Sequence, residues 1–453
     1  MTFPVYLAYK DSGVEWLGEV PEHWAVHPLK RAIERIESGT SVNAADFPAE
    51  PGSLGVLKTS CVYTGKFDWA ENKTVDDEDL SRVSCPLRRD TLIVSRMNTP
   101  DLVGATGLVT EAPNGIFLPD RLWQVYFLVN HSPKFLFYFT KSREYREQVK
   151  MACSGTSASM QNLGQDDFRG LLFAEPPKPE QTQIARFLDH ETARIDALIE
   201  EQQRLIELLK EKRQAVISHA VTRGLDPTVP MKDSEISYLD KSPIHWRLKR
   251  LGDVVAFAQG KAHEPYIDDD GDFICVNSRF VSTEGKTQKY CSVNLTPASV
   301  NDILMVMSDL PNGRALARAY YVIENGRLAV NQRVCRITAE QANSRFLFYL
   351  LNRHPGLMQN DDGVNQTHLS NSDFQKLRVF LPSLAEQLKI AHYLDHVTVR
   401  IDALISEAVT GVGLLQERRS ALISAAVTGK IDVRGWQPPP STQAPKPAVA
   451  EAV

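Results

Sequence analysis

The sequence lacks the marks of several protein classes. It contains no run of 18 apolar residues, so no membrane-spanning helix is expected. Its first residues show no charged stretch followed by an apolar one, so no secretory signal is expected and a cytoplasmic protein is predicted. The six cysteines form no C-x-x-C pair and match no zinc-ligand spacing, so no metal site is predicted.

A surplus of basic residues is also missing. Lys and Arg number 51 against 56 Asp and Glu, which gives a formal net charge of −5. Chains that bind nucleic acids usually carry a basic surplus. Binding depends on the field at one surface, however, and a partner can supply part of the charge. The composition therefore leaves a role in nucleic-acid binding open.

Motifs of the common enzyme classes are absent as well. No G-x-G-x-x-G loop occurs. The segment Glu175-Pro176-Pro177-Lys178 is the nearest approach to a DNA methyltransferase tetrapeptide, and it lacks the aromatic residue that stacks on a flipped base. Gly285-Lys286-Thr287 is similar to the end of a P-loop, but Phe280 stands where the first glycine is needed. We therefore predict no active site in this chain.

The strongest positive feature is an internal repeat. EQTQIARFLDHETARIDALI begins at Glu180 and EQLKIAHYLDHVTVRIDALI begins at Glu386, an offset of 206 residues. The two copies share 26 identities over the 47 positions from Glu180 to Asp226 without a gap. Weaker similarity precedes each copy, whereas the middles of the two halves hardly match. Each half thus has a shared frame around a divergent centre.

The repeated segments are predicted to be two long helices. Their apolar residues recur at spacings of three, four and seven, which indicates one apolar stripe along each helix. A helix of this length would extend about 65 Å and could not bury its stripe alone. We expect the copies to pair as an antiparallel coiled coil. Gly411 and Gly413, each costing about 1 kcal/mol inside a helix, mark a kink, a close helix approach or a local break.

The fold class that follows is α+β: two mixed α/β domains joined by two long helices, with pseudo-twofold symmetry. Short strand-like runs separated by Asn-Gly turns support the mixed domains. The alternative is that both helices are core elements of one large α/β domain. The predicted segments are a first domain at 1–178, a first helix at 179–224, a linker and second domain at 225–382, a second helix at 383–430, and a disordered Pro/Ala-rich tail at 437–453.

This arrangement resembles the specificity subunits of type I restriction-modification systems. The resemblance rests on the P-P-x-x-E-Q-x-x-I-A-x-x-L-D pattern at the first helix and on its second copy without the full proline pair. It also rests on Pro21-Glu22-His23-Trp24 and Pro243-Ile244-His245-Trp246 at the two domain entries. It covers nearly the whole chain except the tail. The helix residues that carry it are Glu180, Gln181, Ile184, Ala185, Leu188 and Asp189, with Glu386, Gln387, Ile390, Ala391, Leu394 and Asp395.

The resemblance implies a non-catalytic, DNA-binding role. Each variable domain would be a target-recognition domain that reads one half of a bipartite, asymmetric site in double-stranded DNA, and the helices would set the gap between the halves. Two modification (methyltransferase) subunits would dock on the frame and methylate adenine N6, and restriction subunits would translocate and cleave DNA. S-adenosylmethionine, ATP and Mg would be bound by those partners, and this chain would bind no cofactor.

Candidate DNA-reading residues were sought among polar side chains in loops. Arg suits guanine, and Asn or Gln suits adenine, in direct readout of base edges. A solvated loop or a phosphate contact is the alternative for each. The first-domain candidates are Lys58, Thr59, Ser60, Arg96, Asn98, Ser157, Ser159, Gln161 and Asn162; the second-domain candidates are Asn277, Ser278, Arg279, Asn312, Arg314, Asn365, Gln366 and Thr367.

Four charged helix residues are candidates for partner docking, because they repeat at the offset of 206: Arg194, Asp196, Arg400 and Asp402. Ion pairing within each helix is the alternative explanation. Two rival functions also stay open at this point. A coiled-coil scaffold or adaptor would bind protein without recognising a DNA sequence, and a fused enzyme would modify DNA on its own.

Overall fold

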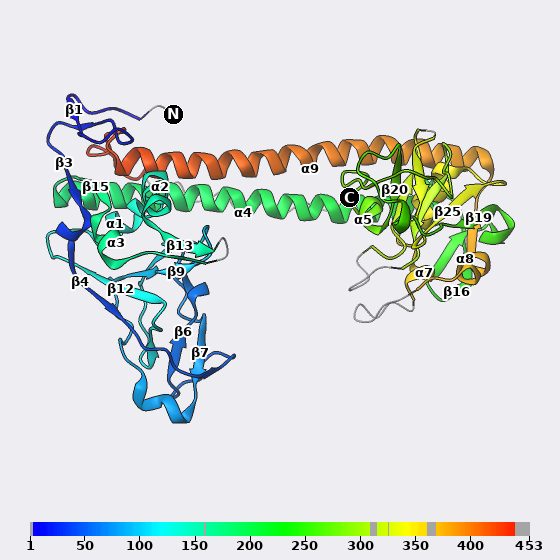
Figure 1. Ribbon diagram of the computed structural model, residues 1–453. Coiled ribbons are helices and arrows are strands. Elements are labelled where there is room, and N and C mark those ends of the chain that lie inside the picture. Colours follow the sequence, from blue (N-terminus) through cyan, green and yellow to red (C-terminus); the bar gives the residue numbers. More distant parts are fainter. Residues whose placement is uncertain (1–2, 158–159, 309–314, 325, 360–367, 440–453) are drawn as a thin grey trace. The chain divides into compact units, whose positions relative to one another are not determined.

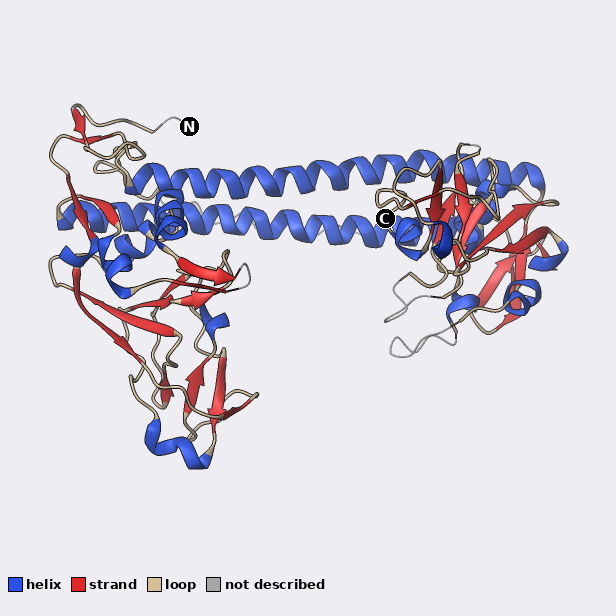
Figure 2. Cartoon of the chain, viewed as in Figure 1, coloured by secondary structure: helices blue, strands red, loops and turns tan. Residues whose placement is uncertain are grey.

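The computed structural model describes residues 3–157, 160–308, 315–324, 326–359 and 368–439, and the chain divides into two compact units. Unit 1 combines Met1–Gln203 with Thr410–Val453, and unit 2 is Arg204–Val409. Two long helices, α4 (Lys178–Arg223, green) and α9 (Leu384–Val427, orange to red), contribute one stretch to each unit (Figure 1). Both units contain helices and strands, which confirms the mixed α and β character predicted from the sequence (Figure 2).

The long helices begin and end where their sequences direct. The carbonyl of Pro177 accepts hydrogen bonds from the amides of Glu180 and Gln181, which closes the first turn of α4. Gly224, directly after α4, and Gly429, just beyond α9, have positive φ values of 81° and 75°, the conformation that terminates helices and favours glycine. Helix α9 runs without a break through Gly411 and Gly413, and a Cβ at either glycine would meet nothing within 4 Å. Neither a local break nor a close helix approach occurs there.

Unit 1 contains two four-stranded sheets in its divergent centre. The first has the order β10-β8-β12-β4 and is antiparallel throughout. The second has the order β11-β6-β7-β5, with β11 parallel to β6. The bounds are β4 Ile33–Ser38, β8 Leu92–Ser95, β10 Thr106–Leu108, β12 Leu122–Phe127, β5 Ala44–Ala45, β6 Gly55–Leu57, β7 Asn72–Val75 and β11 Ile116–Phe117.

Unit 2 repeats this arrangement with a different sequence. Its antiparallel sheet has the order β23-β22-β25-β19, and its second sheet has the order β24-β20-β21, with β24 parallel to β20. The antiparallel sheets of the two divergent centres therefore share one topology, and the second sheets share theirs except for β5, which has no counterpart among the described strands of unit 2. The bounds are β19 Val255–Gln259, β22 Ile303–Val306, β23 Ala319–Tyr321, β25 Val334–Ala339, β20 Phe273–Val276, β21 Tyr290–Cys291 and β24 Leu328–Val330.

The shared frame attaches each centre to the helices by matching short elements. Strand β3 pairs with β15 in unit 1 as β18 pairs with β26 in unit 2, and each unit has an entry hairpin, β1-β2 or β16-β17. The strand bounds are β1 Tyr9–Asp11, β2 Glu19–Pro21, β3 Ala25–Pro28, β9 Met97–Asn98, β13 Ser154–Ser157, β14 Met160–Asn162, β15 Leu172–Glu175, β16 Met231–Ile236, β17 Leu239–Pro243, β18 Arg247–Arg250 and β26 Arg378–Leu381. The short helices are α1 Pro133–Phe139, α2 Arg143–Ala152, α3 Gln165–Gly170, α5 Ser278–Ser282, α6 Ser344–Leu351, α7 Pro355–Met358 and α8 Asn371–Lys376.

Within each unit, α4 and α9 run antiparallel and exchange one ion pair. In unit 1 the carboxylate of Asp196 lies 2.7 Å from Nε of Arg419, and in unit 2 Nε of Arg213 lies 2.9 Å from Asp402. At the offset of 206, Asp196 corresponds to Asp402 and Arg213 to Arg419. The Asp comes from α4 and the Arg from α9 in unit 1, and the Asp comes from α9 and the Arg from α4 in unit 2. Such reciprocal pairing of equivalent positions is typical of a self-complementary interface.

The apolar stripes of the helices are buried in the cores of the two units. In unit 1, Leu188 and Ile195 of α4 share a core with Leu422 and Ile423 of α9. Fully burying such a side chain stabilises the fold by about 1.5–3 kcal/mol. Among the described residues, none of the helices combines the length and the apolar character needed to cross a membrane.

Candidate nucleic-acid interface

The repeated Glu of the helix motif anchors the entry of each unit. In unit 1 the buried carboxylate of Glu180 accepts hydrogen bonds from the hydroxyl of Tyr6 at 2.6 Å and from Nε1 of Trp24 at 3.1 Å, and it lies 2.8 Å from Nε2 of His23. In unit 2, Glu386 makes the equivalent contacts with Nε1 of Trp246 at 3.1 Å and with Nε2 of His245 at 2.9 Å. Burial, aided by Glu180, raises the pKa of Tyr6, which keeps its hydroxyl a donor. In each unit, the contacts between the repeated Glu and the His-Trp pair therefore hold the domain entry against the start of the long helix.

The Gln that follows ties the same helix to a second element. The side-chain oxygen of Gln181 accepts from the amide of Ser132, and its nitrogen donates to the carbonyl of Pro176. Gln387 repeats both bonds, and all four distances are 2.8 or 2.9 Å. Ser132 is the N-cap of α1, so this contact joins α4 to α1.

The Asp of the motif completes the attachment. Asp189 accepts from the hydroxyl of Tyr138 at 2.8 Å and pairs with Lys134 at 2.7 Å. Asp395 accepts from Tyr349 at 2.6 Å and pairs with Arg345 at 2.6 Å. The motif is thus used to hold each divergent centre on its helix, a role that the sequence pattern itself did not reveal.

Three separate segments of unit 1 that carry candidate DNA-reading residues meet in space. Thr59 follows β6, Asn98 follows β8, and Gln161 on β14 is paired with Asn98. Thr59 and Asn98 meet at Tyr63, a partly exposed residue that was not among the candidates. Its hydroxyl lies 2.7 Å from both the Asn98 amide and the Thr59 hydroxyl. An exposed Tyr six residues after a strand has no distinctive sequence signal.

Asn98 is committed to internal bonds. Its side-chain nitrogen donates to Tyr63 and to the hydroxyl of Ser95, and its oxygen accepts from the amide of Thr99. Both amide hydrogens are therefore occupied, and the hydroxyls of Tyr63 and Thr59 stand on the more exposed side of this network.

The other unit 1 candidates also have local partners. Lys58 lies 3.1 Å from Asp46, the hydroxyl of Ser60 donates to Glu71 at 2.6 Å, and Nε of Arg96 donates to the carbonyl of Asp120 at 2.8 Å. The side-chain oxygen of Asn162 is buried without a hydrogen bond from any residue that the structure describes. The side chain of Ser157 and the whole of Ser159 lie outside the described residues.

In unit 2 the described candidates occupy the position equivalent to Lys58–Ser60. Asn277 follows β20 as Lys58 follows β6, and its side-chain oxygen caps α5 by accepting from the amide of Phe280 at 2.9 Å. Ser278 is half-buried and Arg279 is exposed in the first turn of α5. The remaining candidates lie outside the described residues: Asn312, Arg314, Asn365, Gln366 and Thr367. Beside them, Ser308 bridges to His368, as β9 pairs with β14 in unit 1.

The docking candidates divide into two kinds. Asp196 and Asp402 form the ion pairs between the helices. Arg194 and Arg400 are exposed, and Arg194 lies 3.9 Å from Glu191 on its own helix. The two arginines are therefore the members of this set that a partner could reach with least disturbance of the helix pair.

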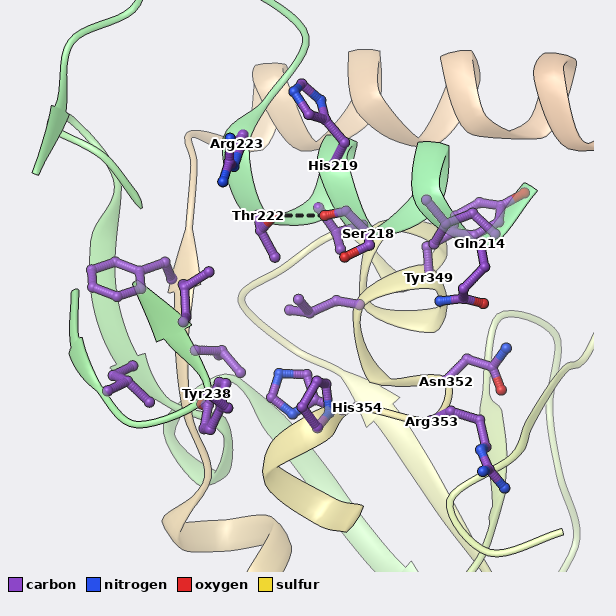
Figure 3. Close-up of a pocket in the computed structure, with 18 of the residues that line it drawn as sticks. Gln214, Ser218, His219, Thr222, Arg223, Tyr238, Tyr349, Asn352, Arg353 and His354 are labelled. Atoms are coloured by element: carbon purple, nitrogen blue, oxygen red, sulfur yellow. Dashed lines mark hydrogen bonds between the residues drawn. The ribbon is translucent and has the colours of Figure 1, made fainter. Parts of the chain in front are cut away.

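Each unit also has a pocket under the C-terminal turns of a long helix. In unit 2 it measures about 500 Å³ and lies between α4, the β16-β17 hairpin and the segment from α6 to α7 (Figure 3). His354 lies in it with Nδ1 accepting from the amide of Gly356, and burial lowers the pKa of His354 to about 4. A pocket of about 490 Å³ in unit 1 is lined by the equivalent turns of α9. Because both units have one, the pocket belongs to the shared frame.

Comparisons with known proteins agree with this architecture. A family model described as the type I restriction modification DNA specificity domain matches residues 243–409. The type I restriction enzyme StySPI specificity subunit of Salmonella potsdam is 24% identical over 451 residues, covering 93% of this chain and 91% of that protein. The putative type I restriction enzyme MjaX specificity subunit of Methanocaldococcus jannaschii is 22% identical over 433 residues, covering 92% and 96%.

Two solved structures share the fold. A chain from a structure of the type I R-M system superposes with a TM-score of 0.70 at 15% identity, covering 90% of this chain and 98% of that chain. The HsdS subunit of Thermoanaerobacter tengcongensis gives a TM-score of 0.52 at 18% identity, with the same coverage of 90% and 98%.

Proposed function

Because this chain belongs to the family of type I restriction-modification specificity subunits, we propose that it selects the DNA site on which a restriction-modification complex acts. One observation carries the proposal furthest. The antiparallel sheets of the two sequence-divergent centres share one strand topology, and one group of candidate residues in each centre follows the equivalent strand, β6 or β20. Two unlike readers on equivalent frames are what an asymmetric, two-part DNA site requires.

The helices serve as the spacer between the two half-sites in this proposal. We propose that α4 and α9 form one antiparallel coiled coil with pseudo-twofold symmetry. The exchanged ion pairs Asp196–Arg419 and Arg213–Asp402 support that symmetry. A fixed helix pair would keep the two recognition units at one separation, and therefore specify the length of the unread gap.

Chemistry is assigned to partner subunits. Two modification subunits would dock on the equivalent frames, bind S-adenosylmethionine and methylate adenine N6 in each half-site, and restriction subunits would use ATP and Mg. The structural role of the repeated Glu, Gln and Asp supports this assignment of chemistry to partners. The charged side chains of the motif form hydrogen bonds and ion pairs within the fold. This chain would contribute recognition of DNA and no catalytic group.

Deleting the gene and sequencing the host genome with detection of modified bases tests the proposal. Loss of one bipartite N6-methyladenine motif, restored by the cloned gene, is the expected result. An unchanged set of methylated motifs would favour a scaffold or adaptor. Methylation by the purified chain alone would show an enzyme and overturn the division of labour.

Arg279 offers a residue-level prediction for unit 2. Replacing Arg279 with Ala should weaken binding to the cognate site by about 1–3 kcal/mol and relax one position of the second half-site, because a bidentate Arg discriminates its base by that amount. The methylated motif of cells carrying R279A provides the measurement, and the first half-site is the internal control. A uniform loss with no relaxed position would make Arg279 a phosphate contact.

Arg194 and Arg400 offer a prediction for partner docking. Reversing both charges, as Arg194→Glu with Arg400→Glu, should abolish co-purification of the modification subunits. The matched control reverses the equivalent exposed acids, Glu201→Arg with Glu407→Arg, which changes the helix charge without touching the proposed contacts. If the arginine double variant still assembles as the wild type does, these residues do not dock the partner.

A further inference from the structure

The two copies of the repeated helix carry equivalent faces that are covered differently. In unit 1 the face consists of Gln183, Phe187 and His190 on α4. Phe187 is fully buried, with the ring of Phe3 at 5.2 Å and that of Trp436 at 5.3 Å. The side chain of Gln183 donates to the carbonyls of Val433 at 3.1 Å and Trp436 at 2.6 Å. The segment around Phe3 and the turn Val433–Trp436 thus cover this face with two aromatic rings.

The equivalent face in unit 2 is left exposed by the residues that the structure describes. At the offset of 206, Lys389, Tyr393 and His396 of α9 replace Gln183, Phe187 and His190. Tyr393 is 41% exposed, and it lies in a shallow hollow of about 550 Å³ with Leu388, Lys389, His392 and His396.

Chain connectivity explains the difference. In unit 2 only residues 224–230 connect α4 with β16, so the link has no length to spare for covering a helix face. In unit 1 the segment after α9 and the segment before β1 lie far apart in the sequence, and both pack on α4.

The sequence of the open face differs in a second, independent way. Leu384, Leu388 and Val399 are 56%, 56% and 69% exposed. Their counterparts on α4 are Lys178, Thr182 and Ala193, which are exposed as well. At these three pairs of positions, large aliphatic side chains thus occur only in α9, the copy whose face is uncovered. Leu388 lines the same hollow as Tyr393, and grouped exposed apolar side chains mark a protein interaction site.

We propose that this face of α9, formed by Leu384, Leu388, Lys389, Tyr393, His396 and Val399, binds a turn-forming segment of a partner protein that carries an aromatic side chain. The contacts of Phe3 and Val433–Trp436 on the equivalent face of unit 1 are the template for the occupant. Lys389 would donate to backbone carbonyls of the segment, as Gln183 does. The hollow has no carboxylate in its lining, so an acidic segment fits best.

The proposal has a consequence for the assembly. Because unit 1 covers its own copy of the face, each chain offers one such site. Two identical partners would therefore contact the chain unequally, and one of them would make a contact that the other cannot. The identity of the partner as a member of the restriction-modification complex rests on the function proposed above.

Photo-crosslinking within the co-expressed complex tests the proposal. Benzoylphenylalanine replaces Tyr393 in the full chain, and the crosslinked peptides are identified by mass spectrometry. The same substitution at Phe187 is the matched control, and it should crosslink only within the chain, to the segments around Phe3 and Trp436. The expected product at position 393 is one segment of a partner subunit that contains an aromatic residue.

A second pair of variants distinguishes the loss of a specific contact from a general folding defect. Leu388→Glu should lower the yield of the 393 crosslink by at least about tenfold, because it places a charge where an apolar contact is proposed. Thr182→Glu, at the equivalent exposed position of α4, should leave that yield unchanged. A crosslink to a second copy of this chain, or none to a partner, overturns the proposal.

The methylated motif separates this test from that of the proposed function. Cells whose chain carries benzoylphenylalanine at position 393, and which keep the bipartite motif but give no partner crosslink, would overturn the docking face alone. A partner crosslink in cells without any motif dependent on this chain would keep the docking face and overturn the proposed function.

Discussion

Replacing Glu180 with Leu is expected to destabilise unit 1 by about 3–5 kcal/mol, because it leaves buried donors without an acceptor. Glu180 is only 7% exposed and receives contacts from Tyr6, His23 and Trp24. Its loss would also release the entry hairpin from α4, since these donors precede β3. Hydrogen exchange measured by mass spectrometry is the suitable readout, because it reports each unit separately within one chain.

The matched control is Glu386→Leu in unit 2. Glu386 contacts His245 and Trp246, and its side chain is 28% exposed, so water can replace part of what is lost. The expected order is therefore a larger increase of exchange in unit 1 for Glu180→Leu than in unit 2 for Glu386→Leu. Glu180→Gln should cost less than Glu180→Leu because the amide oxygen still accepts from Trp24. Equal exchange in wild type and Glu180→Leu would contradict the anchoring role.

Acid is expected to weaken unit 2 through His354. Burial lowers the pKa of His354 to about 4, against an ordinary value of about 6.5. Between pH 6.5 and 4 the His354 side chain is protonated in the unfolded chain but stays neutral in the folded chain. Its contribution to stability is therefore complete above pH 6.5. It is lost as the pH falls toward 4, and the loss reaches about 3 kcal/mol.

His354→Asn isolates this effect. His354 caps α7 by accepting from the amide of Gly356, and Asn is a favoured residue at that position that does not titrate. The variant loses packing against Tyr238, so its stability at pH 7 should fall by a constant amount. Between pH 6.5 and 4 its stability should decline less steeply than that of the wild type. Hydrogen exchange of unit 2 gives both slopes, and unit 1 serves as the internal reference; parallel slopes would exclude His354 as the titrating group.

The long helices were predictable because their signals are local. Their apolar spacing, the prolines at the start of α4 and the glycines beyond both ends act within a few residues of the backbone they direct. The break or close approach considered at Gly411 and Gly413 does not occur. A glycine penalty of about 1 kcal/mol is small beside the burial of residues such as Leu422 and Ile423.

The candidate site was predictable only in outline. Polar loops after strands were identified, but the partners of each side chain were not. Asn98 was a candidate by residue type, and the fold uses both of its amide hydrogens internally. Tyr63 was missed, because its importance comes from contacts with Thr59 and Asn98, which lie four and thirty-five residues away.

The family, the doubled frame and the two long helices follow from the sequence alone, because repeated residues at one offset must form repeated local structure. The common topology of the two divergent centres was decided by tertiary structure. The order of β10-β8-β12-β4 and of β23-β22-β25-β19 depends on pairing between distant strands with dissimilar side chains. The role of the repeated Glu, Gln and Asp was likewise decided there, since their partners His23, Ser132 and Tyr138 lie far from them in the chain. The covering of Phe187 and the exposure of Tyr393 have the same cause: equivalent residues on equivalent helices acquire different neighbours, because Phe3 and Trp436 pack on Phe187 whereas residues 224–230 link α4 directly to β16 in unit 2.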